Sequence, residues 1–125
     1  MNLEEFISAL NTAAQKYALN VQVIAQTQNS VKARIDISES IAVQWYYNQK
    51  SATTNFVMIG WSRRLYGRDS VGGTWHRHPF DDPDSHDDSA TGSTPVEPEQ
   101  FLDEVFEILI NEGLISPPVP GEDDP

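Results

Sequence analysis

All three histidines of the chain, His76, His78 and His86, fall within eleven residues. Imidazole titrates near neutral pH, so a pair with one ring protonated could act as general base and general acid on a phosphodiester. Neutral rings could instead bind a divalent metal ion, with His86 or a carboxylate from residues 81–88 as a further ligand. The cluster therefore predicts either an acid–base site or a metal site.

Two glycines before the cluster place these side chains on a predicted hairpin. Gly72-Gly73 can adopt the positive φ angles of a two-residue turn, which sets the register of the flanking strands. Asp69 then lies opposite His76, and Gly67 lies opposite His78. Alternation along the strands places Asp69 and both histidines on one face. We expect Asp69 to fix the tautomer of His76 and stabilise its protonated form, while Gly67 leaves space beside His78.

Four of the eight basic residues lie around the same hairpin. Arg68 and Arg77 oppose each other on the face away from the histidines, where like charges destabilise a strand pair. Arg63 and Arg64 lie nearby, so the four arginines could bind a phosphate or a carboxylate. They could equally be paired with the acidic residues that follow the hairpin.

Charge divides the chain into two parts. Residues 1–80 carry eight basic and five acidic residues, a net of +3, whereas residues 81–125 carry fourteen acidic residues and no base, a net of −14. The total of −11 argues against non-specific affinity for nucleic acid. We expect residues 81–93 to form an acidic loop, without the glycine of a calcium loop, and residues 116–125 to form a disordered, proline-rich tail.

Composition excludes several classes of protein. The absence of cysteine rules out disulfides, thiolate nucleophiles and cysteine-based zinc or iron–sulfur sites. No apolar run reaches the roughly 18 residues of a membrane helix, and the N-terminus lacks the basic and apolar regions of a secretory signal. These features are consistent with a cytoplasmic protein that has no cofactor, unless the histidines bind a divalent metal.

Hydrophobic periodicity predicts the elements that position the hairpin. Apolar residues at three- and four-residue spacing indicate a helix over 3–17, with Asn2 as N-cap and Glu5 completing a capping box. Alternating patterns predict three strands, and the continuous apolar run 56–61 predicts a fourth that is covered on both faces. The alternating strands span 21–25, 31–37 and 41–47.

A second helix is predicted near the C-terminus. Thr94 is the expected N-cap, with Pro95 at the first helical position and Glu97 closing the capping box. An apolar stripe spans 101–109, and Gly113 is a natural stop. The expected architecture is one α+β domain: a helix, an antiparallel meander of five to six strands, and a helix. Both helices should pack on one sheet face, and the apolar second helix could extend a homodimer interface.

The domain is expected to cover residues 1–115. Its hairpin resembles the TumE-like toxins of bacterial toxin–antitoxin systems, and the resemblance follows the order of elements over most of the chain. The segments that carry it are Trp61–Asp69, Trp75–Pro79, Pro83 and His86. The resemblance implies an Arg–Asp pair at Arg68 and Asp69 and functional histidines at all three positions. It further implies a cytoplasmic protein that inhibits growth by acting on RNA and is held by a helix-turn-helix antitoxin.

The leading interpretation is a small toxin-like ribonuclease that acts on RNA phosphodiesters. His76 and His78 would form the acid–base pair, and Asp69 would orient them. Arg64 and Arg68 would bind the phosphate. One alternative is a non-catalytic interaction module, in which the acidic loop and tail bind a basic partner. The other is a metal-binding protein that uses the three histidines.

Overall fold

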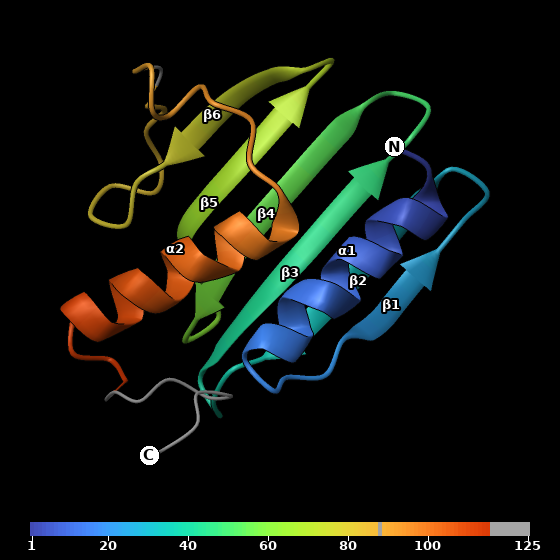
Figure 1. Cartoon of the computed structure of the whole chain (residues 1–125). Helices are drawn as coiled ribbons and strands as arrows, with labels where there is room; N and C mark the ends of the chain where they lie inside the picture. Colours follow the sequence, from blue (N-terminus) through green and yellow to red (C-terminus); the bar gives the residue numbers. More distant parts are fainter. Residues whose placement is uncertain (88, 116–125) are drawn as a thin grey trace.

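The structure, a computed structural model, describes residues 1–87 and 89–115. Along the chain, one helix precedes and one helix follows a six-stranded antiparallel meander, in which each strand pairs with the next (Figure 1). This confirms the predicted α+β fold, and the expected tail at 116–125 lies outside the described residues. The elements are α1 (Leu3–Lys16), β1 (Gln22–Gln26), β2 (Ser30–Asp36), β3 (Ile41–Asn48), β4 (Thr53–Gly60), β5 (Arg63–Val71), β6 (Thr74–His78) and α2 (Pro98–Asn111).

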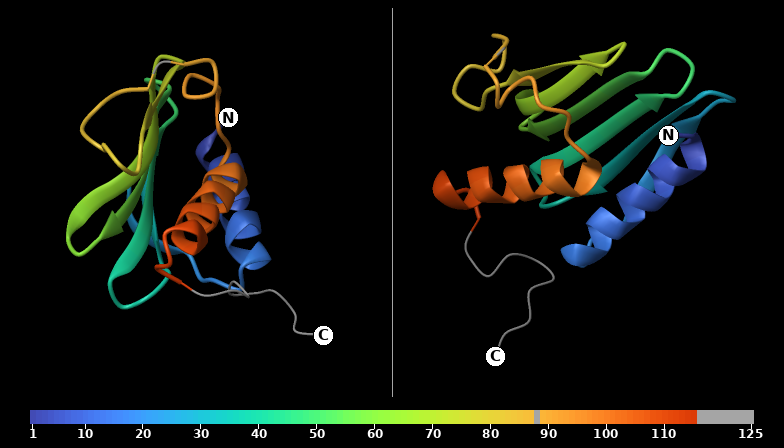
Figure 2. Two further views of the ribbon diagram at one scale, coloured as in Figure 1. Left: turned by 90° about the vertical axis from the view of Figure 1, so that its left-hand side faces the viewer. Right: turned by 45° about the horizontal axis from the view of Figure 1, so that its top comes forward.

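Both helices pack on the same face of the sheet, as predicted, so the molecule has two layers (Figure 2). α1 lies against β2 and β3, and α2 lies against α1 and β4. Their apolar stripes and the inward side chains of the strands form one hydrophobic core, whose burial is the main stabilising contribution. The largest fully buried side chains include Trp45, Phe56, Phe101 and Phe106.

Among the residues that the structure describes, no helix packs on the other face of the sheet, which we call the open face. Along β4, Phe56 and Met58 are buried in the core, whereas Val57 and Ile59 are only half-buried on the open face. The expectation that this strand is covered on both faces is therefore wrong. Apolar side chains on a half-exposed face are common, and here they hide the alternation that identifies a one-sided strand.

Of the predicted N-terminal elements, the helix is confirmed and the first strand differs. Asn2 Oδ1 accepts a hydrogen bond from the Glu5 N–H, and Glu5 Oε1 accepts one from the Asn2 N–H. β1 is exposed along its whole length, with Val23 and Ile24 about half exposed. A bulge between Val23 and Ala25 interrupts its pairing with β2. β1 is thus an open edge strand rather than a half-buried one.

The start of α2 differs from the prediction by three residues. Glu97 is the N-cap and Pro98 is the first helical residue, whereas the Thr94 hydroxyl bonds to a loop carbonyl. A helix that began at Pro95 would place Pro98 where the first intrahelical N–H must donate, and proline has no N–H. At the other end, Gly113 has a φ of 70° just beyond the helix, which agrees with the predicted stop.

The hairpin of β5 and β6 has the predicted register. Gly72-Gly73 forms its turn with φ angles of 61° and 90°. Asp69 pairs with His76 and Gly67 pairs with His78, so these residues share the open face of the sheet. The register of a two-residue hairpin follows directly from its turn, which is why the sequence pattern was sufficient.

Candidate functional site

The three histidines converge on the open face, beside the loop that follows β6. His76 and His78 project from β6, and His86 folds back from the loop. The His86 ring stacks on His76 at a centroid distance of 5.3 Å and meets His78 edge-on at 4.7 Å. The structure thus brings together the imidazoles that the sequence singled out.

His78 is the buried member of the cluster, with 5% of its surface exposed. Its Nε2–H donates to Asp69 Oδ2 over 2.8 Å, and its Nδ1 lies 3.1 Å from the carbonyl oxygen of Pro83. Asp69 therefore orients His78, where the sequence pattern predicted His76. Gly67 lies opposite His78, and the His78 ring packs over it, with Cδ2 3.8 Å from where a Cβ at position 67 would stand. These contacts make His78 a positioning residue.

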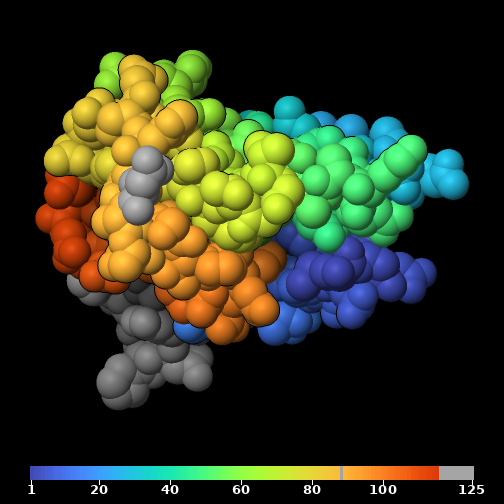
Figure 3. Space-filling view, turned by 90° about the horizontal axis from the view of Figure 1, so that it is seen from above, coloured from blue at the N-terminus to red at the C-terminus, as the bar shows by residue number. Residues whose placement is uncertain are grey.

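Residues 79–93 make up the clamp loop, and its described residues, 79–87 and 89–93, are fastened to β5 and β6 at three places. The first is the contact of Pro83 with His78. The second is Arg77, whose Nε donates to Asp87 Oδ2 over 2.8 Å and whose backbone pairs with the same residue. The third is Arg68, whose Nη1 donates to the carbonyl oxygens of Thr91 and Gly92. Figure 3 shows the loop packed against the hairpin and α2. The predicted acidic loop is thus built around three side chains of the hairpin.

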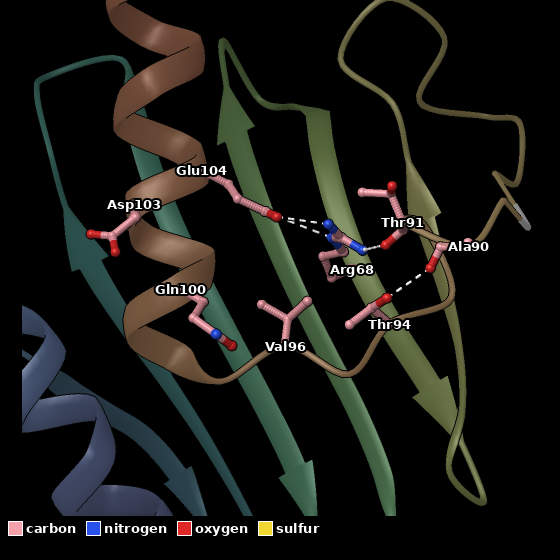
Figure 4. Close-up of a pocket in the computed structure, with 8 residues that line it drawn as sticks. All are labelled: Arg68, Ala90, Thr91, Thr94, Val96, Gln100, Asp103 and Glu104. Atoms are coloured by element: carbon pink, nitrogen blue, oxygen red, sulfur yellow. Dashed lines mark hydrogen bonds and ion pairs between the residues drawn. The ribbon is translucent and has the colours of Figure 1, made fainter.

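Arg68 lies on the helix side of β5, facing Glu104 of α2 (Figure 4). Asp69, the next residue along the strand, projects on the opposite face. Arg68 Nε donates to Glu104 Oε1 over 3.1 Å and its Nη2 to Glu104 Oε2 over 2.6 Å. The Tyr66 hydroxyl donates to the same carboxylate over 2.6 Å. Arg68 is 2% exposed and already makes four hydrogen bonds, two of them to the clamp loop. It anchors α2 and the loop, so we do not assign it the phosphate-binding role that was expected.

Burial and the contacts with Glu104 shift the pKa values of Tyr66 and Arg68. Burial, followed by the hydrogen bond to Glu104, raises the pKa of Tyr66. Burial lowers the pKa of Arg68, but its contacts with Glu104 and Tyr66 outweigh burial and raise that pKa overall. A groove of about 540 Å³ runs beside the anchor, with Asp103 also in its wall. The Arg68 guanidinium in the wall of this groove is neutralised by Glu104, so the groove does not favour an anionic ligand.

The other three arginines differ in their availability. Arg77 is held by Asp87, as the alternative of pairing with the acidic loop predicted. Arg63 and Arg64 are exposed at the start of β5. Arg64 Nη1 lies 3.4 Å from His78 Nδ1, so Arg64 is the arginine of the predicted four that the structure places at the histidines.

No three histidine, aspartate or glutamate side chains within 1–87 and 89–115 are grouped so that they could hold a metal ion. Asp69 and Pro83 take up both ring nitrogens of His78. The described part of the chain therefore offers His76 and His86 as metal ligands without a third. The metal-binding interpretation has no support in this geometry.

No protein-family model matches this chain. Searches of curated proteins and of solved structures likewise found no match. Within the described residues, neither helix is long and apolar enough to span a membrane. The site must accordingly be interpreted from its own geometry.

The ion pair between Asp87 and Arg77 should make the clamp loop sensitive to acid. Hydrogen bonds from Ser89, followed by the Arg77 contact, lower the pKa of Asp87 to about 2. A depressed pKa stabilises the folded state above the unfolded value of about 3.9, and this contribution disappears as the pH falls towards 2. Asp87→Asn should therefore melt below the wild type at pH 6, and the gap should close by pH 2. Asp84→Asn, which removes a neighbouring exposed carboxylate, is the control in thermal unfolding. An equal gap at both pH values would contradict the assignment.

Proposed function

We propose that the protein cleaves single-stranded RNA at the imidazole cluster on the open face. The observation that carries the proposal is the stacking of His76 and His86 at 5.3 Å, with His78 fixed beneath them by Asp69. Two adjacent imidazoles can supply the base and the acid that phosphodiester cleavage needs. The TumE-like resemblance supports the same substrate, and with it a cytoplasmic location and a helix-turn-helix antitoxin as partner.

The proposed reaction is a transesterification. One imidazole of the His76–His86 pair accepts the proton of a ribose 2′-hydroxyl, and the 2′-oxygen forms a bond to the adjacent phosphorus. The bond from phosphorus to the 5′-oxygen of the next nucleotide breaks, and the other imidazole, protonated, gives its proton to that oxygen. The products are a 2′,3′-cyclic phosphate and a 5′-hydroxyl, so atoms and charge balance without a further reactant.

The remaining side chains position these groups. Asp69, which is half-buried, holds the buried His78 in place beside the other two imidazoles. Arg64, exposed and next to His78, is the cation available to the phosphate, whose charge it would neutralise in the transition state. This arrangement replaces the expected His76–His78 pair by His76 and His86, because His78 is buried.

The test is the chemistry of the products formed by the full chain from a defined single-stranded RNA. We expect fragments that end in a 2′,3′-cyclic phosphate and begin with a 5′-hydroxyl. The same oligonucleotide with 2′-deoxyribose at the cleaved position should remain uncut, because the attacking oxygen is missing. Cleavage of the deoxy substrate, or the absence of any cleavage over pH 5–8, would overturn the proposal.

A further inference from the structure

One row of side chains crosses the open face from β2 to β6. The register pairs Lys32 with Tyr46, Tyr46 with Asn55, Asn55 with Asp69, and Asp69 with His76. Directly paired residues of neighbouring strands project on the same face of a sheet. Strands lie about 4.8 Å apart, so this row, which we call the cross-strand row, spans about 19 Å.

The chemistry of the cross-strand row suits a single-stranded nucleic acid. Lys32 is exposed and forms no ion pair with any residue that the structure describes. Tyr46 is half-buried, and Asn55 is exposed. The three residues share the wall of a hollow of about 180 Å³ on this face, together with Gln44 and Val57. A lysine can contact a phosphate, an aromatic ring can stack on a base, and an amide can bind a base edge.

Charge separates the two faces of the molecule. α2 carries Glu99, Asp103, Glu104 and Glu107 and no basic residue. Asp103 and Glu104 are paired with Lys16 and Arg68, but Glu99 and Glu107, together with Glu4 and Glu5 of α1, leave the helix layer with a net negative charge that repels a polyanion. On the open face, the carboxylates of Asp36 and Asp69 are each bonded to a basic side chain, Arg34 and His78. Lys32 and Arg64 add positive charge to that face. A nucleic acid is therefore directed towards the open face.

We propose that single-stranded RNA binds along the cross-strand row, with a phosphate at Lys32, a base against the Tyr46 ring and the scissile phosphodiester at His76. This rests on the proposed function and names the path of its substrate. The clamp loop, with exposed Asp81, Asp82 and Asp84, borders the row beyond β6. Its negative charge opposes a strand that continues past β6, so the bound nucleotides extend from His76 towards β2.

The test measures binding separately from cleavage. The probe is a 2′-O-methyl RNA of roughly eight nucleotides, within the site sizes of small single-strand-binding domains, which cannot be cleaved by attack of a 2′-oxygen. Fluorescence anisotropy with the full chain should show that Tyr46→Ala binds about 5- to 150-fold more weakly, while Tyr46→Phe keeps the wild-type affinity. Lys32→Ala should lower the slope of log affinity against log salt concentration by about 1. Lys16→Ala, on the helix layer, is the matched control and should bind as the wild type.

Each of the following outcomes overturns the binding path alone, or the binding path together with the cleavage proposal. If the wild type cleaves RNA but Lys32→Ala and Tyr46→Ala bind the probe as tightly as it does, the path is overturned and the cleavage proposal stands. If Lys16→Ala weakens binding as much as Lys32→Ala, the path is also overturned. If the wild type neither binds the probe nor cleaves RNA, both proposals fall. With the path correct, Lys32→Ala raises KM for RNA cleavage and leaves kcat unchanged, because the contact is remote from the reacting atoms.

Discussion

A Glu104→Leu variant is expected to lose about 3 kcal/mol of the free energy of unfolding, because it leaves the Arg68 guanidinium buried without a counter-charge. The side chain of Arg68 is 2% exposed, and that of Glu104 is 30% exposed. Partial exposure of Glu104 places the loss at the lower end of the range of about 3–5 kcal/mol for broken buried pairs. Small domains have about 5–15 kcal/mol in total, so urea denaturation should show a large fall in the midpoint.

The double variant Arg68→Met/Glu104→Leu separates the charge from the shape of the site. It removes both charges and should recover most of the loss, because apolar residues of similar size often replace a buried ion pair without cost. Glu107→Leu, one turn further along α2 and exposed, should change the free energy of unfolding by less than about 0.5 kcal/mol. A Glu104→Leu variant as stable as the wild type would show that Arg68 is not an anchor.

Replacing His86 by alanine is expected to lower the rate of RNA cleavage by about 10²- to 10⁴-fold, the contribution typical of one general acid or base. His86 is exposed in the clamp loop and contacts both other imidazoles through its ring. The loop keeps its contacts through Pro83 and Asp87, so the fold should persist. The rate is measured under single-turnover conditions, so that product release does not mask the chemical step.

His76→Ala should reduce cleavage to a similar extent, and the double variant with His86→Ala should be little worse than either single one. Groups that act together on one reaction are strongly non-additive. Gln26→Ala, exposed on β1 at the far edge of the sheet, is the control and should cleave at the wild-type rate. Multiplicative losses in the double variant would indicate that the two imidazoles act independently, contrary to the proposed pair.

Much of the fold and half of the site could be predicted from the sequence because they depend on local rules. The α1 capping box follows from Asn2 and Glu5, three residues apart. The register of β5 and β6 follows from Gly72-Gly73, and the shared face of Asp69 and His76 follows from that register. In each case the interacting residues are close in sequence or are joined by one turn.

The rest depends on packing between distant segments. Arg68 and Glu104 are 36 residues apart, and their contact exists only once α2 has docked. A weak signal was present, since Glu104 lies on the flank of the apolar stripe, three residues after Phe101. The turn between β4 and β5 gave no signal: Trp61 and Ser62 have φ angles of 50° and 65°, a conformation normally identified by glycine or asparagine.

Burial explains the change in the roles of the histidines. The spacing of His76 and His78 predicts a shared face, but it does not reveal that the His78 ring is buried against Gly67. Nor does it reveal that the clamp loop brings His86 to the other two rings. The acidic residues of that loop were recognised as partners for arginine, and the pairing of Asp87 with Arg77 agrees with that alternative.

Leu65 is an extra residue in β5, placed between the pairs Met58–Tyr66 and Ile59–Arg64. This bulge sets the phase of the rest of the strand, in which Arg68 binds the helix layer and Asp69 binds His78. Deleting or inserting one residue here would turn the whole hairpin over, because the Gly72-Gly73 turn keeps Asp69 in register with His76. Asp69 and the histidines of β6 would then face the helix layer, and Arg68 would lie on the open face. The attachment of α2 to the sheet and the proposed reaction on the open face thus depend on the same strand register, and a shift of one residue would abolish both.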